Sequence, residues 1–371
     1  GKALRHPLRR WVVRGSGARQ EVILSSAHKS TNRGNSVEQD RRQFMKSFAS
    51  VGAVGAASMA MSQAGCAQQS ESPAAAAPTY AGRYGKGEAL AGPYLDLRTG
   101  RGNQLAYARI QSDINFGQQK YFWFKGYLSA VRPWKKVDDL LGCQGFGVIR
   151  LNEREDGSFE RMCREIILYT DMQGNVLSEW DNPYTNKTVE VVQVANDPFN
   201  YLIQDHFPAP PSFGGMNKEE APPKIPFVLP WYQHDKWLEM EMHIHLLYPS
   251  ALQPDEWPLE SSGSMVQVSE YFAHHVLAED MQNKDVTSLD YKGTWNRTTP
   301  WLPWMLMGQA EGHCQYNCFM GNTDDLSIVL SKSALDYAEK HYPTYFDAPT
   351  EWSDESLSSL ENYAHGRTPK T

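Results

Sequence analysis

Short runs of alternating hydrophobic and polar residues recur along the chain from about residue 94 to residue 320. The runs are rich in Tyr, Trp, Phe and Val, and turn-forming Gly, Pro, Asn and Asp separate them. Alternation with a period of two is typical of strands that bury one face. The pattern therefore predicts strands at residues 104–112, 120–131, 146–150, 158–169, 176–180, 189–194, 237–248, 265–277, 292–298 and 313–320.

The pattern changes to a helical period after the last of these strands. Asp324 or Asp325 can cap a helix there, because either carboxylate can accept a hydrogen bond from the first turn. Short links between many strands, followed by one late helix, argue against alternating strands and helices. The predicted fold class is mainly β: an antiparallel, barrel-like or sandwich domain with one C-terminal helix. The apolar face of that helix would consist of Leu326, Val329, Leu330, Ala334, Tyr337 and Ala338.

A proline-rich segment at residues 206–230 interrupts the strand pattern. A stretch of that length without regular structure is typical of a functional lid or of an exposed excursion. We expect a lid.

The segment before the strands is typical of an exported protein. Arg41 and Arg42 are followed by Phe44 and Lys46, and a weakly apolar run covers residues 48–61. This pattern resembles a twin-arginine signal, and the run is too short and too mildly hydrophobic to span a membrane. We therefore predict the Tat export machinery as a partner, a periplasmic location and no transmembrane span.

Two processing routes fit the end of this signal. Cleavage after Ala64 suits an ordinary signal peptidase, whereas Gly65-Cys66 resembles a lipoprotein box that would place a lipid anchor on Cys66. The chain has no Met before Met45, and Val37 stands where a signal starting at a GTG codon would begin. The predicted organisation is an upstream non-native extension (1–36), a twin-arginine signal peptide (37–66), an Ala/Pro/Gly-rich linker (67–93), a single β-rich domain (94–350) and a polar tail (351–371).

Charge and cysteine content narrow the class of protein further. The formal net charge is −7, although residues 1–66 carry eleven Lys or Arg against three Asp or Glu. The rest of the chain is strongly acidic, which disfavours nucleic acid as a partner because phosphates require the opposite charge. Export permits disulfides among Cys143, Cys163, Cys314 and Cys318, and their pairing is left open.

The sequence EMEMHIHLL at residues 239–247 contains the first candidate site. Successive side chains of a strand point to opposite faces, so the acidic and imidazole side chains share one face and the apolar ones share the other. Two histidines in such a row lie roughly 6.6 Å apart, close enough to bind one divalent metal ion. The alternatives are a pocket without metal and a row that simply faces solvent. The candidate catalytic residues of this row are Glu239, Glu241, His243 and His245, with His243 and His245 as metal ligands.

The next predicted strand carries two adjacent histidines, His274 and His275. Adjacent residues face opposite ways, so one of them would share a face with the row of His243 and His245 if the strands pair. We expect that one to join the candidate catalytic group, as a metal ligand or as a general base.

Residues 293–309 contain the candidate ligand-binding residues. Two prolines hold Trp301 and Trp304 in place, which suits stacking on a flat ligand, although the same residues can plug one end of the core. Trp295 and Arg297 share a face of the strand before them, where the arginine can bind an anionic group of a ligand or an internal carboxylate.

No standard catalytic signature is present: GxSxG, HExxH and GxxxxGK[ST] are all missing. We predict an exported protein that binds a small aromatic or apolar molecule in an internal pocket. Two versions stay open: an enzyme of the hydrolase, lyase or isomerase class, and a non-catalytic periplasmic carrier. A divalent metal is the one cofactor that the histidine pattern suggests.

Three passages carry a family resemblance: KYFWFKGYLSAV (120–131), EIILYTDMQGNVLSEWDNPYTNKTVEVVQVANDPFN (165–200) and GTWNRTTPWLPWMLMG (293–308). Together they resemble the bacterial family called domain of unknown function 1838, over residues 94–350. The resemblance implies a single exported domain, and it assigns no activity and no site residues.

Overall fold

The computed structural model describes residues 90–207, 224–353 and 358–370. The predicted extension (1–36), the signal peptide (37–66) and nearly all of the predicted linker (67–93) lie outside these ranges. Residues 208–223 of the expected lid also lie outside them. No helix in the described part of the chain has the length and apolar content needed to cross a membrane.

One curved sheet of ten strands forms the body of the protein, and every pair of neighbouring strands is antiparallel. The order across the sheet is β6-β3-β2-β1-β12-β11-β10-β9-β8, and β7 also pairs with β3. These strands are β1 (Gln119–Val131), β2 (Asp138–Glu153), β3 (Phe159–Thr170), β6 (Val194–Asn196), β7 (Tyr201–Ile203), β8 (Trp231–His234), β9 (Trp237–Pro249), β10 (Met265–Leu277), β11 (Lys292–Thr299) and β12 (His313–Thr323). A separate hairpin pairs β4 (Glu179–Asn182) with β5 (Lys187–Glu190).

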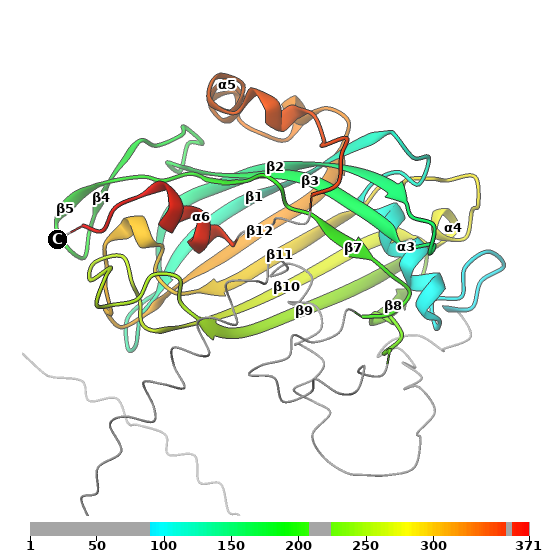
Figure 1. Ribbon diagram of the computed structural model, residues 1–371, viewed down its shortest axis with the longest axis horizontal. Coiled ribbons are helices and arrows are strands. Elements are labelled where there is room, and N and C mark those ends of the chain that lie inside the picture. Colours follow the sequence, from blue (N-terminus) through cyan, green and yellow to red (C-terminus); the bar gives the residue numbers. More distant parts are fainter. Residues whose placement is uncertain (1–89, 208–223, 354–357, 371) are drawn as a thin grey trace, which may run out of the picture.

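The predicted fold class, mainly β and antiparallel, is confirmed, but the sheet is not closed into a barrel. Its end strands β6 and β8 do not pair with each other in the described residues. Figure 1 shows the sheet curled into a trough, with α6 (Ser359–Gly366) over the open side and α5 (Lys332–His341) against the opposite face. We call the concave face the inner face and the convex face the outer face.

The first predicted strand, residues 104–112, is wrong, because this segment belongs to helix α3 (Gly100–Gln111). Thr99 caps the helix by accepting a hydrogen bond from the Gly102 amide at 3.0 Å. The helix is buried around most of its circumference, so its sequence lacks the one-sided apolar period that marks a surface helix. Even the Arg109 side chain is fully buried and donates to the carbonyl oxygens of Asp280, Met281, Asn283 and Val286.

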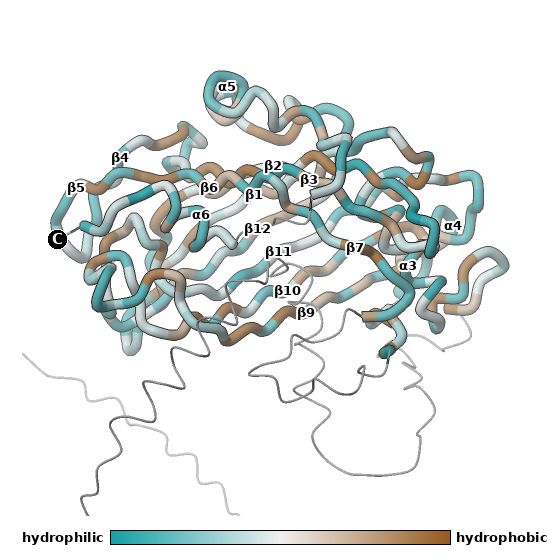
Figure 2. The backbone as a smooth tube through the Cα atoms, in the orientation of Figure 1, coloured by the Kyte–Doolittle hydropathy of each residue, from teal (hydrophilic) through white to brown (hydrophobic). Residues whose placement is uncertain are grey.

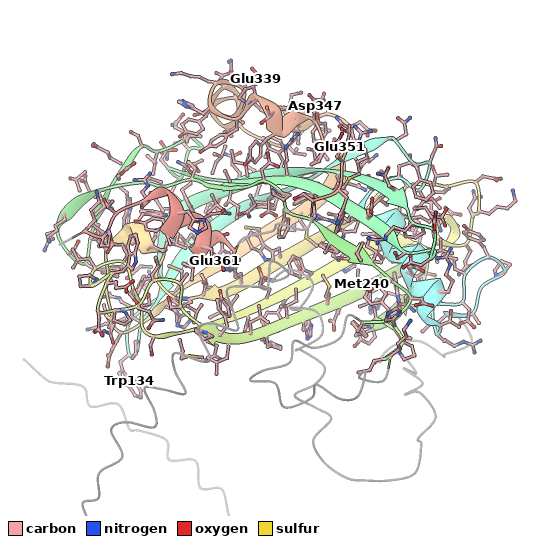
Figure 3. The ribbon with its side chains drawn as sticks, viewed as in Figure 1. Trp134, Met240, Glu339, Asp347, Glu351 and Glu361 are labelled. Carbon is pink, nitrogen blue, oxygen red and sulfur yellow. The ribbon has the colours of Figure 1, made fainter. Side chains whose placement is uncertain are left out.

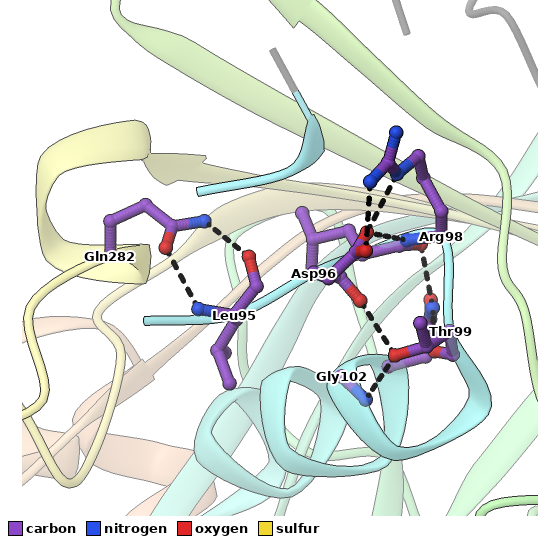
Figure 4. A network of polar contacts seen from close by, with 8 residues as sticks. Leu95, Asp96, Arg98, Thr99, Gly102 and Gln282 are labelled. Atoms are coloured by element: carbon purple, nitrogen blue, oxygen red, sulfur yellow. Dashed lines mark hydrogen bonds and ion pairs between the residues drawn. The ribbon is translucent and has the colours of Figure 1, made fainter. Parts of the chain in front are cut away.

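The segment before α3 is hydrogen-bonded to the loop that follows the short helix α4 (Ala278–Met281), at the same end of the sheet as α3 (Figure 1). Figure 4 shows the side chain of Gln282 accepting a hydrogen bond from the Leu95 amide at 2.9 Å and donating to the Leu95 carbonyl at 3.0 Å. Gln282 directly follows α4, which begins where β10 ends. These contacts hold α3 across one end of the trough.

The C-terminal helix is confirmed with a later start. Asp325 caps only the short 3₁₀ helix η4 (Leu326–Ile328), and Ser331 caps α5 by accepting a hydrogen bond from the Ala334 amide. A second helix, α6, follows beyond residue 357. The residues that pack α5, η4 and η5 (Pro343–Phe346) on the outer face of the sheet are Phe146, Ile166, Leu168, Leu326, Leu330, Ala334, Ala338 and Tyr345.

Two glycines of β2 allow large rings to lie on the inner face. Gly145 pairs with Phe124 and Gly147 pairs with Phe122 on the neighbouring strand. A Cβ atom on Gly145 would lie 2.4 Å from the ring of Phe124, and one on Gly147 would lie 2.2 Å from the ring of Phe122. The two rings therefore lie across β2 because it has no side chains at these points.

The four cysteines are buried free thiols in the structure, so none of the disulfides that export would permit is present among them. Cys143 and Cys318 both pair in register with Gly126, from opposite sides of β1. Their Cα atoms are thus two strands apart, roughly 10 Å, which is beyond the reach of a disulfide. Burial raises the pKa of the Cys163 and Cys314 thiols to about 12, so both stay protonated at neutral pH.

Candidate functional site

The acidic and imidazole row of β9 faces solvent, which is one of the alternatives that the sequence left open. His243 and His245 are exposed on the outer face, and Glu239 and Glu241 share that face with them. The residues that line the cavity of the inner face are Met242, Ile244, Leu246 and Tyr248. A period of two separates a strand into two faces without saying which face is inside, and burial of the apolar row decides the orientation here.

The contacts of the outer row are those of solvent-facing side chains. His243 Nε2 lies 3.7 Å from the Glu241 carboxylate, and His275 Nε2 lies 3.5 Å from Glu239. The described residues contain no cluster of three His, Cys, Asp or Glu side chains that could hold a metal ion. The predicted catalytic role of His243, His245, Glu239 and Glu241, and the metal role of the two histidines, stay predictions.

The two histidines of β10 lie on opposite faces of the sheet, as expected for adjacent residues of a strand. His275 lies on the outer face beside Glu239, whereas His274 is 3% exposed and lines the inner cavity. Burial, with a smaller effect of His275, lowers the pKa of His274 to about 3, so its imidazole is neutral at physiological pH. Its Nδ1 has no hydrogen-bond partner among the described residues.

A cavity of about 250 Å³ lies on the inner face of the sheet, next to α3. Its walls are mostly aromatic and aliphatic, with a few charged side chains set among them. Such a composition is typical of small-molecule sites. The apolar walls include Phe122, Phe124, Phe199, Phe272, Trp295, Met242, Ile244, Leu246, Val268 and Met320.

Arg297 and Glu270 form an ion pair inside this cavity. They lie opposite each other on β11 and β10, and Arg297 Nη1 is 3.3 Å from Glu270 Oε1. Trp295 Nε1 donates to the same oxygen at 3.2 Å. The Arg297 side chain keeps 27% of its surface exposed, so the pair leaves part of this side chain open to a ligand, while its Nε is buried without a partner among the described residues. Trp295 and Arg297 are thus placed in a pocket together, and the ion pair that we kept as an alternative is also present.

A second group of charged residues, Arg161 and Glu165 on β3, was missed in the sequence. Arg161 donates to the Gln111 side chain at 2.9 Å and to the Phe199 carbonyl at 3.0 Å, and its guanidinium lies 4.6 Å from the ring centre of Tyr201. Glu165 accepts a hydrogen bond from Asn196 at 2.9 Å through Oε1. Burial raises the pKa of Glu165, and the hydrogen bond from Asn196 and the charge of Arg161 oppose this increase.

A second cavity of about 210 Å³ continues along the inner face on the side of η3 (Pro303–Met305). Trp301 and Trp304 line it, and their role in ligand binding stays a prediction. Both are also buried in the core, where Trp304 contacts Tyr169 and Trp180 at ring distances of 5.3 and 5.9 Å. Trp301 and Trp304 therefore fill the core at this end of the sheet and also form part of the cavity wall. The two cavities share the wall residues Ile167, Tyr248, Trp295, Arg297, Ser359 and Leu360.

Helix α6 covers part of the open side of both cavities. Ser358 caps it in a capping box with Glu361, which Figure 3 labels on this helix in front of the sheet. Asn362 donates to the Asn196 side chain at 3.1 Å, which fixes α6 against β6. Ser359 and Leu360 then face the space that the curved sheet encloses.

Figure 2 shows hydrophobic and hydrophilic segments alternating along the strands of this sheet, in accord with one inner and one outer face. The fold and the cavities together define an open antiparallel β-sheet protein with an aromatic-walled internal cavity. The family model described as protein of unknown function (DUF1838) matches residues 117–366, and the chain belongs to this family. The match covers the whole sheet and α6, and the resemblance found in the sequence is confirmed. A search of the curated proteins finds no match.

Proposed function

We propose that the protein binds a small molecule with an aromatic or apolar body and one anionic group in the cavity of the inner face. The observation that carries this proposal is the open part of the Arg297 side chain within walls of Phe, Trp and Met side chains. An apolar cavity of about 150 Å³ is enough to hold benzene, so about 250 Å³ has room for a molecule of about two rings.

The charges in the cavity favour an anion. Arg161 and Arg297 supply two positive charges, and Glu270 supplies a negative one. Burial favours the neutral form of Glu165, and His274 is neutral. Because burial raises the pKa of Glu165, the negative charge of this group opposes the two arginines less than that of an exposed carboxylate would, and the arginines would stabilise a monoanionic ligand in a medium of low dielectric constant.

The proposal is tested with 2-naphthoate and its neutral analogue 2-naphthamide. Trp295 lies in the cavity wall, so binding should change tryptophan fluorescence, and calorimetry gives the affinity. We expect naphthoate to bind more tightly, and Arg297→Gln to weaken naphthoate about tenfold or more with little effect on naphthamide. His243→Ala on the outer face is the matched control. Equal loss of both probes in Arg297→Gln, or no binding of either probe, would contradict the proposal.

A second candidate is an enzyme of the isomerase class, and the pair of Glu165 and Glu270 favours it. Each carboxyl group lines the same cavity and uses Oε1 for its hydrogen bonds to protein, while Oε2 has no partner among the described residues. In this version Glu270 accepts a proton from a carbon next to a carbonyl, and protonated Glu165 donates its proton to the carbonyl oxygen to give an enol. Return of a proton at carbon completes the cycle without another reactant.

This version is tested with phenylpyruvate, an aromatic monoanion with exchangeable benzylic protons. NMR in D₂O follows their replacement by deuterium with and without protein. The enzyme version requires faster exchange with the protein and loss of that acceleration in Glu165→Gln, with phenylpyruvate still bound. Binding without accelerated exchange would favour the non-catalytic carrier.

We also propose that the protein works in the periplasm after export. The support is the arrangement of Arg41, Arg42, Phe44 and Lys46 before a short apolar run. Residues 37–66 fused to a folded reporter should deliver it to the periplasm, and Arg41→Lys with Arg42→Lys should retain it in the cytoplasm. Mass spectrometry of the mature natural protein distinguishes cleavage after Ala64 from a lipid on Cys66.

A further inference from the structure

The two cavities of the inner face form consecutive lobes of one trough that runs along the strands. We call the cavity of about 250 Å³ beside α3 lobe one, and the cavity of about 210 Å³ beside η3 lobe two. On β10, His274 lines lobe one and Val266, eight residues earlier on the same face of the strand, lines lobe two. At about 3.4 Å per residue, the lined part of this strand is roughly 27 Å long.

The ion pair of Arg297 and Glu270 lies where the two lobes meet. Arg297, Trp295 and Tyr248 line both lobes, and Glu270 is bound to Arg297 and Trp295. Apolar walls continue on either side of this junction. In lobe one they include Phe122, Phe272 and Met242, and in lobe two Leu252, Val266 and Trp301.

We infer that the ligand has two arms, each aromatic or apolar, joined by a central carboxylate that binds Arg297 at the junction of the lobes. This inference rests on the proposed function and adds the shape of the ligand to it. A polar group near the middle of a long trough pairs with the middle of a ligand, and the two apolar arms then fill the walls on both sides.

The rival arrangement places the carboxylate at one end of the ligand, on Arg161 in lobe one. The contacts of Arg161 argue against it. Its side chain donates to Gln111 and to the Phe199 carbonyl, rings of Tyr201 and Phe199 lie over it, and only 3% of the residue is exposed. Among the described residues, Arg297 has one hydrogen-bond partner, Glu270, and its side chain is 27% exposed. A ligand carboxylate therefore reaches Arg297 without displacing buried contacts.

The inference is tested with two isomeric probes. Dibenzylacetate has its carboxylate midway between two phenyl groups, and 4-(2-phenylethyl)phenylacetate has the same atoms with the carboxylate at one end. Calorimetry on the full chain should give an affinity about tenfold or more higher for dibenzylacetate. Equal affinities, or tighter binding of the end-carboxylate isomer, would overturn the two-armed ligand.

Two neighbouring valines of β10 allow each lobe to be filled separately. Val268 lines lobe one and Val266 lines lobe two, on the same strand face, and both are buried, with 3% and 5% of their surface exposed. Val268→Phe and Val266→Phe should each weaken dibenzylacetate about tenfold, because each removes the space for one arm. The one-armed 2-naphthoate should lose affinity in only one of them. If only one variant affects dibenzylacetate, the second lobe takes no part in binding and the inference fails.

The outcomes separate this inference from the function on which it rests. If the protein binds none of these probes, the proposed function fails together with the inference. If it binds 2-naphthoate through Arg297 but shows no preference for dibenzylacetate, only the two-armed ligand is wrong. Circular dichroism checks that each phenylalanine variant is folded, and the isomer preference of the unaltered protein tests the inference without any variant.

Discussion

Both faces of the sheet carry charged side chains, but the contacts of these side chains differ. On the outer face, Glu239 lies 3.1 Å from His234 and 3.5 Å from His275, and Glu241 lies 3.7 Å from His243. His245 Nδ1 lies 3.1 Å from Ser269 Oγ, and the side chains of this row stay partly or fully exposed.

On the inner face, Arg161 is buried, Glu165, Glu270 and Arg297 are partly buried, and each of the four is hydrogen-bonded to another residue that lines the cavity. A charged side chain that faces solvent has little effect on stability, whereas a charged side chain among aromatic walls lowers stability. A charge in the second position is therefore expected where a function requires it. The inner group is thus the better candidate site.

The largest expected difference between the faces concerns two aromatic residues of adjacent strands. Trp295 is 6% exposed and its ring lies 5.0 Å from Phe124 and 5.2 Å from Tyr316, whereas Phe319 on the outer face is 72% exposed. Trp295→Ala should lower the free energy of unfolding by about 3 kcal/mol or more, and Phe319→Ala by about 0.5 kcal/mol or less. Urea unfolding followed by circular dichroism measures both. Similar losses in the two variants would mean that the faces are not buried differently.

The next difference concerns the carboxylates. Glu270→Ala leaves the Arg297 guanidinium in the cavity without its partner, and we expect a loss of about 3 kcal/mol. Glu241→Ala removes only a 3.7 Å contact with exposed His243 and should cost about 0.5 kcal/mol or less. The double variant Glu270→Ala with Arg297→Met should recover part of the loss, since it also removes the unpaired charge. A Glu270→Ala protein as stable as Glu241→Ala would contradict the ion pair.

The two histidines of β10 should differ in their response to acid. The pKa of buried His274 is about 3 in the folded protein, below the usual value of 6.5, so the unfolded chain binds the extra proton. Above about pH 6.5 the imidazole is neutral in both states. As the pH falls from 6.5 towards 3, protonation of His274 in the unfolded chain lowers the free energy of unfolding by about 1.4 kcal/mol per pH unit. His274→Leu should reduce this loss between pH 6.5 and 4, and His275→Leu on the outer face should not. Urea midpoints at a series of pH values test this, and parallel profiles for the two variants would contradict it.

The alternating pattern predicted most of the sheet, because most strands point one face to the inside of the trough and the other face outward. The predicted strand at 265–277 matches β10 at both ends, and the strand predicted at 292–298 differs from β11 by one residue. The pattern failed at α3, where burial on most sides hides the helical period. It also could not show that β6 and β8 stay apart, because closure of a sheet depends on its curvature and not on any one strand.

The candidate site was predicted in part, for a related reason. Trp295, Arg297 and His274 were named from the sequence and line the cavity. Arg161 and Glu165 were missed, although the sequence held a signal: the strand FERMCREIILYT is apolar at positions of both faces, which indicates cover on both sides. Arg161 and Glu165 are on the face of this strand that lines the cavity, whereas Glu160 and Arg164 are on the other face. The partners of Arg161 and Glu165 are Gln111 of α3, Asn196 of β6 and Tyr201 of β7, all more than 30 residues away in the sequence, so their pairing could not be read from spacing.

The smallest expected effect concerns the outer histidines, and it decides between the two faces as sites. His243 and His245 are exposed, with ring centres 6.3 Å apart and Tyr271 packed between them at 5.0 and 5.3 Å. The double variant His243→Ala with His245→Ala removes little buried surface, so the free energy of unfolding should change by about 0.5 kcal/mol or less. Affinity for 2-naphthoate should stay the same, because the inner face is untouched. Metal analysis of natural protein and of this variant completes the test. A stoichiometric metal that disappears with these two side chains would move the site to the outer face.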